Sequence, residues 1–181
     1  MGNSIVRGVK RETEARAVLV GLDFSGKTKI LYWLKNQSPT ELELCLGPTK
    51  GFNVETIQGN TKITIWDIGG NVNERCHWRH FYPNIDAVIF VIDANDPVRF
   101  MEAVEELKSV VDSPDLHESI PILMYINKVD CPNSMQVEEI TSQLPSLKTH
   151  TNYVQACSAQ TGEGLKEGLV WLETTINNKL A

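Results

Sequence analysis

Residues 21–28 read Gly-Leu-Asp-Phe-Ser-Gly-Lys-Thr and combine glycines, a lysine and a hydroxyl in a spacing that can hold a phosphate. They follow the apolar run 17–20 and precede a segment with helical periodicity. A glycine-rich turn between a strand and a helix directs backbone N–H groups and the helix dipole at an anion. Lys27 is then placed to reach the outer phosphates, and the Thr28 hydroxyl to ligate Mg²⁺. The alternative is a turn that carries Lys-Thr by chance, which the flanking strand and helix disfavour.

A second group with chemistry follows the apolar run 63–66, where Asp67 comes directly before Ile68-Gly69-Gly70. A carboxylate at the end of a buried strand, downstream of a phosphate loop, is placed to hold Mg²⁺ through a water molecule. Gly70 has no side chain, so its backbone N–H can approach a terminal phosphate. The alternative is an aspartate that caps a helix after a glycine turn.

A third group, Asn127-Lys128-Val129-Asp130, follows the apolar run 121–126 and points to the base. The Asp130 carboxylate can accept two hydrogen bonds side by side, which matches the N1–H and 2-amino donors of guanine. Asn127 can bond the purine and brace the phosphate loop, while the aliphatic stem of Lys128 covers the base. After the run 153–157, the small residues Ser158-Ala159 allow a backbone N–H to face guanine O6, and Ala159 is the expected donor.

A fourth group is the loop Pro48-Thr49-Lys50-Gly51-Phe52-Asn53. The Thr49 hydroxyl can complete the Mg²⁺ shell, and the Thr49 backbone can touch the γ-phosphate. A loop held by Mg²⁺ and the γ-phosphate is released once that phosphate leaves, so the sequence predicts a switch.

The elements that position these groups alternate between apolar runs and segments of helical period, which is typical of a parallel sheet covered on both faces. Residues 52–58 and 61–66 flank Gly59-Asn60, a hairpin signal that places one strand antiparallel at an edge. The sequence predicts an α/β, doubly wound, mostly parallel six-stranded sheet, with ligands at the carboxyl ends of the strands. Helical stripes are expected at Met101, Val104, Leu107 and Val111 and at Leu165, Leu169, Leu172 and Ile176.

Composition excludes several other classes of protein. The 181 residues are 41% hydrophobic, which suits one domain, and the formal charge of -6 without a basic stripe argues against nucleic-acid binding. Cys45, Cys76, Cys131 and Cys157 are widely spaced and are expected to be reduced thiols. No apolar run is long enough for a membrane span. We expect a monomer in the cytoplasm.

Residues 1–16 are expected to form an N-terminal extension, and residues 17–181 the folded domain. Met removal would expose Gly2 for N-myristoylation, although Val6 stands where the acylation pattern prefers Ser or Thr. One acyl chain binds membranes only marginally, and the apolar and basic residues of this segment offer a weak second signal. The alternative is a frayed polar terminus.

Residues 21–28, 48–56, 66–70 and 78–80, together with 127–130, closely match the markers of one family. The chain resembles the Arf/Arf-like small GTPases over nearly all of its length. The resemblance implies GTP/GDP and Mg²⁺ as ligands, and an exchange factor, an activating protein and effectors as partners. It also implies a peripheral location on the Golgi or another endomembrane, a role in vesicle transport, and a hairpin 52–66 that shifts register between nucleotide states.

The resemblance implies that three aromatic side chains, Phe52, Trp66 and Phe81, form a surface that binds effectors. For Trp66, packing in the core is an equal alternative. The resemblance implies that Lys27 and Asn71 are catalytic. It also implies that Mg²⁺ is bound by Thr28, by Thr49 and, through water, by Asp67. The residues expected to contact the nucleotide are Gly21, Asp23, Phe24, Ser25, Gly26, Lys27, Thr28, Lys29, Thr49, Gly70, Asn127, Lys128, Asp130, Ser158 and Ala159.

The chain departs from the family at one catalytic position. Asn71 stands where the family carries the glutamine that orients the attacking water. Asparagine is one methylene shorter, so its reach falls by roughly 1.5 Å, and a misplacement of about 1 Å can cost about a hundredfold in rate. We therefore expect slow GTP hydrolysis. One alternative is a GTP-locked binding module. Another is a phosphate-loop kinase, against which Asn127, Asp130 and the Thr49 loop argue. Phe24 and Ser25 also replace small residues of the family's phosphate loop.

Overall fold

The computed structural model describes residues 14–35, 47–147 and 149–180. Its described strands form one six-stranded sheet in the order β2-β3-β1-β4-β5-β6. The strands are β1 (Glu14–Gly21), β2 (Phe52–Gln58), β3 (Lys62–Ile68), β4 (Ala87–Asp93), β5 (Ile122–Asn127) and β6 (Asn152–Ala156). The β2–β3 pair is antiparallel, with β2 at the edge, and the other neighbours are parallel. The predicted fold class is confirmed.

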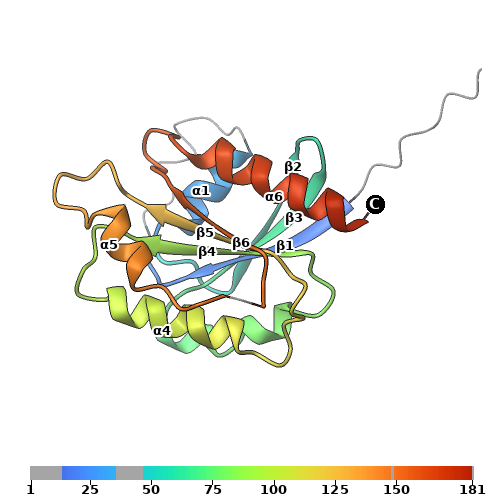
Figure 1. Ribbon diagram of the computed structural model, residues 1–181, viewed down its shortest axis with the longest axis horizontal. Helices are drawn as coiled ribbons and strands as arrows, with labels where there is room; N and C mark the ends of the chain where they lie inside the picture. Colours follow the sequence, from blue (N-terminus) through green and yellow to red (C-terminus); the bar gives the residue numbers. More distant parts are fainter. Residues whose placement is uncertain (1–13, 36–46, 148, 181) are drawn as a thin grey trace, which may run out of the picture.

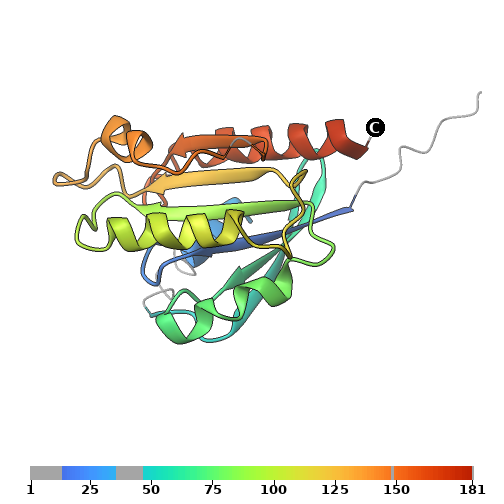
Figure 2. The ribbon, with the colours of Figure 1, turned by 60° about the horizontal axis from the view of Figure 1, so that its bottom comes forward.

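Helices cover both faces of the sheet (Figure 1). The described helices are α1 (Lys27–Leu34), α3 (Val72–Arg75), the 3₁₀ helix η1 (Trp78–Phe81), α4 (Phe100–Val111), α5 (Val137–Ser142) and α6 (Leu165–Leu180). Helices α1 and α6 pack on one face, and η1, α4 and α5 on the other. Figure 2, turned by 60°, shows α4 and α6 on opposite sides of the strands.

The central strands are apolar at nearly every position because both of their faces are covered. Along β1, Leu19 faces α1 and α6, while Val18 and Val20 face the α4 side. The same alternation continues through β4 and β5, where Phe90 and Tyr125 are fully buried on opposite faces. This packing fixes the strand ends, and therefore the loops that leave them, relative to one another.

The first strand begins at Glu14, so residues 14–16, which the sequence assigned to the extension, belong to the sheet. Gly2 and the predicted apolar and basic segment lie outside the described residues. Among the described helices, none has the length and apolarity that crossing a bilayer requires.

Helix α6 buries Leu165, Leu172 and Ile176, with Leu169 packed against them, as predicted. Of the stripe predicted for α4, Leu107 is buried and Val104 and Val111 pack against the core, but Met101 is 54% exposed. The buried face of α4 is formed by Phe100, Ala103, Leu107 and Val110. This face also has helical spacing, so the pattern alone could not decide between the two stripes.

The hairpin was predicted at the right place, with a turn one residue too short. Gln58 pairs with Lys62, which leaves residues 59–61 in the turn. The buried carboxylate of Glu173 on α6 accepts from the Thr61 backbone N–H at 3.5 Å and from the Asn60 side-chain amide at 3.4 Å. Thr61, the additional residue of the turn, is therefore held by a hydrogen bond to α6.

Candidate functional site

The loop 21–28 joins β1 to α1 and lines a cavity of about 190 Å³ at the carboxyl ends of the strands. The cavity is lined by Asp23, Phe24, Gly26, Lys27, Thr28, Lys29, Gly47, Pro48, Thr49, Gly70 and Lys128. Sequence segments far apart in the chain therefore meet at one place, as expected for ligand binding in a doubly wound sheet. A larger cavity of about 710 Å³ lies between η1 and α4 and contains none of the predicted nucleotide-binding residues.

The Lys27 ammonium is buried over the phosphate loop and donates to the carbonyls of Gly21 and Leu22, each at 2.9 Å. Burial lowers the pKa of Lys27 to about 8, and the carboxylates of Asp67 and Asp23 oppose this shift. A cation held in low dielectric without a full counter-charge favours an anionic ligand. Lys27 is therefore suited to the phosphate role predicted for it.

Gly26 precedes α1 in a left-handed conformation, with φ of +95°. A Cβ at Gly26 would lie 2.3 Å from the Asn127 amide nitrogen, so both backbone conformation and space require glycine. Phe24 also adopts a positive φ of 62° and is 57% exposed. The positive φ costs about 1 kcal/mol of local strain. Because the ring is exposed and displaces nothing in the core, the loop tolerates this departure from small residues.

The residues predicted to hold Mg²⁺ converge in the structure. The hydroxyls of Thr28 and Thr49 lie 2.8 Å apart, and Thr28 donates to Asp67 Oδ2 at 2.5 Å. Asn53 also donates to this oxygen, at 3.3 Å. The other oxygen, Asp67 Oδ1, is buried and has no hydrogen-bond partner within the described residues.

This donor set fits a hard cation, because Mg²⁺ prefers hydroxyl, carboxylate and water oxygens. Burial raises the pKa of Asp67, while the hydrogen bond from Thr28 and the charge of Lys27 oppose the rise. An orphaned buried carboxylate oxygen is costly unless a cation or water meets it. When bound, Mg²⁺ would neutralise phosphate charge here, held by Thr28, Thr49 and Asp67.

Asn127 ties the phosphate loop to the last strand. Its side-chain nitrogen donates to the Ser25 carbonyl at 2.8 Å, and its oxygen accepts from the Ala159 backbone N–H at 2.9 Å. The bracing role predicted for Asn127 is therefore present. The Ala159 N–H, predicted to face guanine O6, donates to Asn127 in this structure, and its contact with a base stays a prediction. The turn after Cys157 brings this amide directly to the Asn127 side chain.

The remaining base-site residues lie at the same edge. Lys128 has a positive φ of 67° and donates to Asp93 at 2.5 Å, which fixes its stem beside the cavity. Asp130 is exposed, and Ser158 is buried with its hydroxyl accepting from Gln160 and Thr161 backbone N–H groups at 3.2 and 3.1 Å. Their contacts to a nucleotide stay predictions.

The loops around Gly70 pack backbone against backbone. A Cβ at Gly70 would lie 2.2 Å from the Gly21 carbonyl, so no other residue fits here. The Gly70 carbonyl accepts from the Asp23 backbone N–H at 3.0 Å, and the Gly69 N–H donates to the Gly51 carbonyl at 2.8 Å. The phosphate loop, the Thr49 loop and the start of α3 are thereby joined.

Asn71 is the N-cap of α3, and its side-chain oxygen accepts from the Asn73 backbone N–H at 3.0 Å. Asparagine is among the best N-cap residues, because its short side chain reaches the N–H groups left unpaired at the helix start. The amide predicted to orient water is therefore engaged by the helix.

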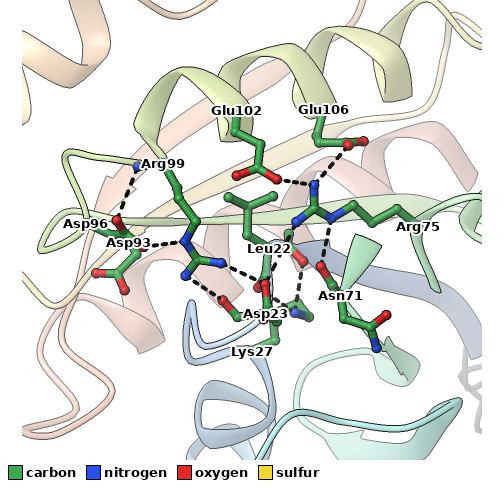
Figure 3. A network of polar contacts seen from close by, with 12 residues as sticks. Leu22, Asp23, Lys27, Asn71, Arg75, Asp93, Asp96, Arg99, Glu102 and Glu106 are labelled. Carbon is green, nitrogen blue, oxygen red and sulfur yellow. Dashed lines mark hydrogen bonds and ion pairs between the residues drawn. The ribbon is translucent and has the colours of Figure 1, made fainter. Parts of the chain in front are cut away.

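A cluster of charges behind the cavity was missed in the sequence. Figure 3 shows Arg75 pointing toward Glu102 and Glu106 of α4. The Arg75 side chain is only 7% exposed. The guanidinium donates to Glu102 at 2.6 Å and to Glu106 at 3.1 Å on α4, and lies 3.8 Å from Asp23. Arg99 also donates to the Asp23 carboxylate, at 2.7 Å. The clue available was the i, i+4 pair of glutamates on one face of a helix.

Phe52, Trp66 and Phe81 form an aromatic cluster, with ring centroids between 5.3 and 5.8 Å apart. Phe52 is 50% exposed, while Trp66 is half-buried and packs against the α4-side core. The predicted patch therefore exists as a surface feature, and its use by effectors stays a prediction.

The strand order, the phosphate loop 21–28, and the Thr49 and Gly70 loops that meet it together define a small GTPase of the phosphate-loop class. The family model of the ADP-ribosylation factor family matches residues 3–176, and the chain belongs to this family. The fold is similar to that of the Arl6 (BBS3) small GTPase of Trypanosoma brucei, solved with the bound nucleotide analogue GppNp. The two chains are 32% identical, with a TM-score of 0.82 over 92% of this chain and 99% of that one. Membership supports a GTP-binding switch and a GTP hydrolase.

Proposed function

We propose that this protein is a GDP/GTP switch that hydrolyses GTP slowly because Asn71 caps α3. A family glutamine would reach further, toward the water in line with the γ-phosphate. Asn71 is shorter by one methylene, and its oxygen is occupied by the Asn73 N–H at 3.0 Å. To orient water, Asn71 would have to leave the cap, at a cost of about 1 kcal/mol. The capped conformation is the observation that carries this proposal.

The residues of this chain that act on GTP are assigned as follows. Lys27 binds the outer phosphates, and the Gly70 N–H meets the γ-phosphate. Thr28 and Thr49 hold Mg²⁺, and Asp67 holds it through a water molecule. Asp130 accepts hydrogen bonds from the N1–H and 2-amino groups of guanine, and Asn127 braces the phosphate loop beside the base site.

We further propose that the GTP state recruits effectors through Phe52, Trp66 and Phe81, at an endomembrane surface in vesicle transport. The exposed Phe52 ring at the cluster's edge supports this role. Gly2 acylation would supply the membrane contact. The mass of the protein purified from its native source tests acylation directly, and an unmodified Gly2 would remove that part of the proposal.

The experiment on hydrolysis compares single-turnover rates of wild type, Asn71→Gln and Asn71→Ala with bound GTP and Mg²⁺. We expect Asn71→Gln to be faster by up to about a hundredfold. We expect Asn71→Ala to match wild type, because the wild-type amide is used by the cap. Equal rates for wild type and Asn71→Gln would overturn the proposal.

A second candidate function is a GTP-locked binding module, which the same cap favours. In that case turnover stays negligible even with an activating partner, and the protein copurifies with GTP. Bound GDP would exclude the module. Preference for ATP over GTP would contradict both functions.

A further inference from the structure

We infer that Trp78 and Arg75 are positioning residues that hold the Gly70 amide toward the terminal phosphate of the nucleotide. The inference rests on the proposed function, in which the Gly70 N–H meets the γ-phosphate. It adds that side chains outside the nucleotide pocket set the direction of this N–H, and therefore the preference of the protein for GTP over GDP.

The first contact is between Trp78 and the peptide unit that carries the Gly70 N–H. The indole Nε1 of Trp78 donates to the Gly69 carbonyl at 2.8 Å, and Trp78 is only 2% exposed. A trans peptide is planar, so its C=O and N–H point in opposite directions. Fixing the Gly69 carbonyl on Trp78 therefore fixes the Gly70 N–H on the opposite side of the peptide.

The indole itself has little freedom to move. Trp78 packs in the α4-side core and meets the Phe90 ring edge-on, at a centroid distance of 6.4 Å. A donor fixed by close packing is pre-oriented, so it holds its acceptor without reorganisation when a ligand arrives.

The second contact is between Arg75 and the next peptide unit. Arg75 Nε donates to the Gly70 carbonyl at 2.8 Å, and Asp23 donates its backbone N–H to the same oxygen at 3.0 Å. Both lone pairs of this carbonyl are thus used. Glu102 and Glu106 hold the other end of the guanidinium (Figure 3). The peptides before and after Gly70 are therefore fixed by different side chains.

These contacts matter because Gly70 has no side chain to restrict its two backbone angles. Glycine reaches conformations closed to other residues, so a free Gly69-Gly70 segment could turn its N–H away from the ligand. GDP has no terminal phosphate for this N–H, whereas GTP does. Loss of either contact should therefore weaken GTP binding selectively.

The test measures affinities for GppNp and for GDP, both with Mg²⁺, by calorimetry on the full chain. Trp78→Phe keeps an aromatic ring but removes the N–H donor, and Arg75→Lys keeps the charge but loses the fork that reaches the Gly70 carbonyl and both glutamates. We expect each variant to bind GppNp about tenfold more weakly, with GDP affinity within about twofold, as for the loss of one oriented hydrogen bond. Trp171→Phe, on α6 and stacked on Tyr153, is the matched control and should change neither affinity.

The outcomes separate the inference from the proposed function. If wild type binds neither nucleotide, the proposed function fails. If wild type binds both and the variants lose GppNp and GDP affinity in parallel, the residues act only on general stability and the inference fails. Unchanged GppNp affinity in both variants would also overturn it.

Discussion

The side-chain amide of Asn127 donates to the Ser25 carbonyl across 2.8 Å, although 102 positions separate the two residues. Ser25 lies in the phosphate loop and Asn127 ends β5, so this bond joins the phosphate side of the cavity to the base side. The same side chain accepts from the Ala159 N–H. One buried amide thereby joins the two segments that are proposed to contact one nucleotide.

Replacing Asn127 should reveal how much this bond contributes. Asn127→Ala leaves the Ser25 carbonyl and the Ala159 N–H unpaired, and each buried unpaired group costs about 1–3 kcal/mol. We expect the free energy of unfolding in urea to fall by about 3 kcal/mol. Asn127→Asp keeps the acceptor for Ala159 and loses the donor for Ser25, so it should also be destabilised. A change below about 1 kcal/mol in Asn127→Ala would contradict the bridging role.

The Asn71 cap makes a prediction that needs no nucleotide turnover. Asn71→Ala removes the acceptor for the Asn73 N–H, whereas Asn71→Ser keeps a capping oxygen. Loss of about 1 kcal/mol at the cap should speed hydrogen exchange of the Asn73 amide about fivefold in Asn71→Ala. Exchange in Asn71→Ser should stay close to wild type. Equal exchange in wild type and Asn71→Ala would show that the cap is not populated.

The two glutamates that meet Arg75 should not contribute additively. In Glu102→Gln or Glu106→Gln, one carboxylate still faces the buried guanidinium, so we expect losses below about 1 kcal/mol each. In the double variant Asp23, at 3.8 Å, is the remaining carboxylate partner of Arg75 within the described residues, and we expect a loss of about 2–3 kcal/mol. Urea unfolding of the four proteins gives the coupling energy. Glu105→Gln, at an exposed position on α4, is the control, and additive losses would argue against a shared partner.

The buried thiol of Cys157 should make stability depend on pH. Burial raises the pKa of Cys157 well above its ordinary value of 9.0. The unfolded chain therefore releases this proton first, so the stabilisation is complete below pH 9 and declines as pH rises above it. Between pH 8 and 10, wild type should lose about 1.4 kcal/mol more than Cys157→Ala. Cys76→Ala, at an exposed thiol, should keep the wild-type pH dependence, and parallel curves for wild type and Cys157→Ala would refute the assignment.

Much of the site could be read from the sequence because its parts are short segments at strand ends. The phosphate loop follows β1, while Asp67 and Asn127 lie at the ends of β3 and β5, and parallel strands bring their carboxyl ends to one edge. The mostly parallel sheet with one antiparallel edge strand was also predictable, since alternating strands and helices allow few topologies.

The side chains behind the site could not be read in this way. Arg75 meets Glu102 and Glu106 across 27 and 31 positions, and the i, i+4 spacing of the two glutamates does not say which residue pairs with them. Asn71 was recognised as a substitution, but its cap depends on where α3 begins, and helix ends are poorly encoded by periodicity. The bond from the Ala159 N–H to Asn127 was not anticipated, because the direction of one N–H depends on turn geometry that the sequence does not display.

The space around Gly70 has a consequence for how this protein can change over time. The group proposed to read the terminal phosphate belongs to the main chain, and a Cβ at this position would collide with Gly21 at 2.2 Å. Substitution of Gly70 itself therefore cannot adjust the nucleotide preference, because no other residue fits at this position. If related proteins differ in their preference for GTP over GDP, we therefore expect the responsible substitutions at Trp78 and Arg75, which orient the Gly70 N–H.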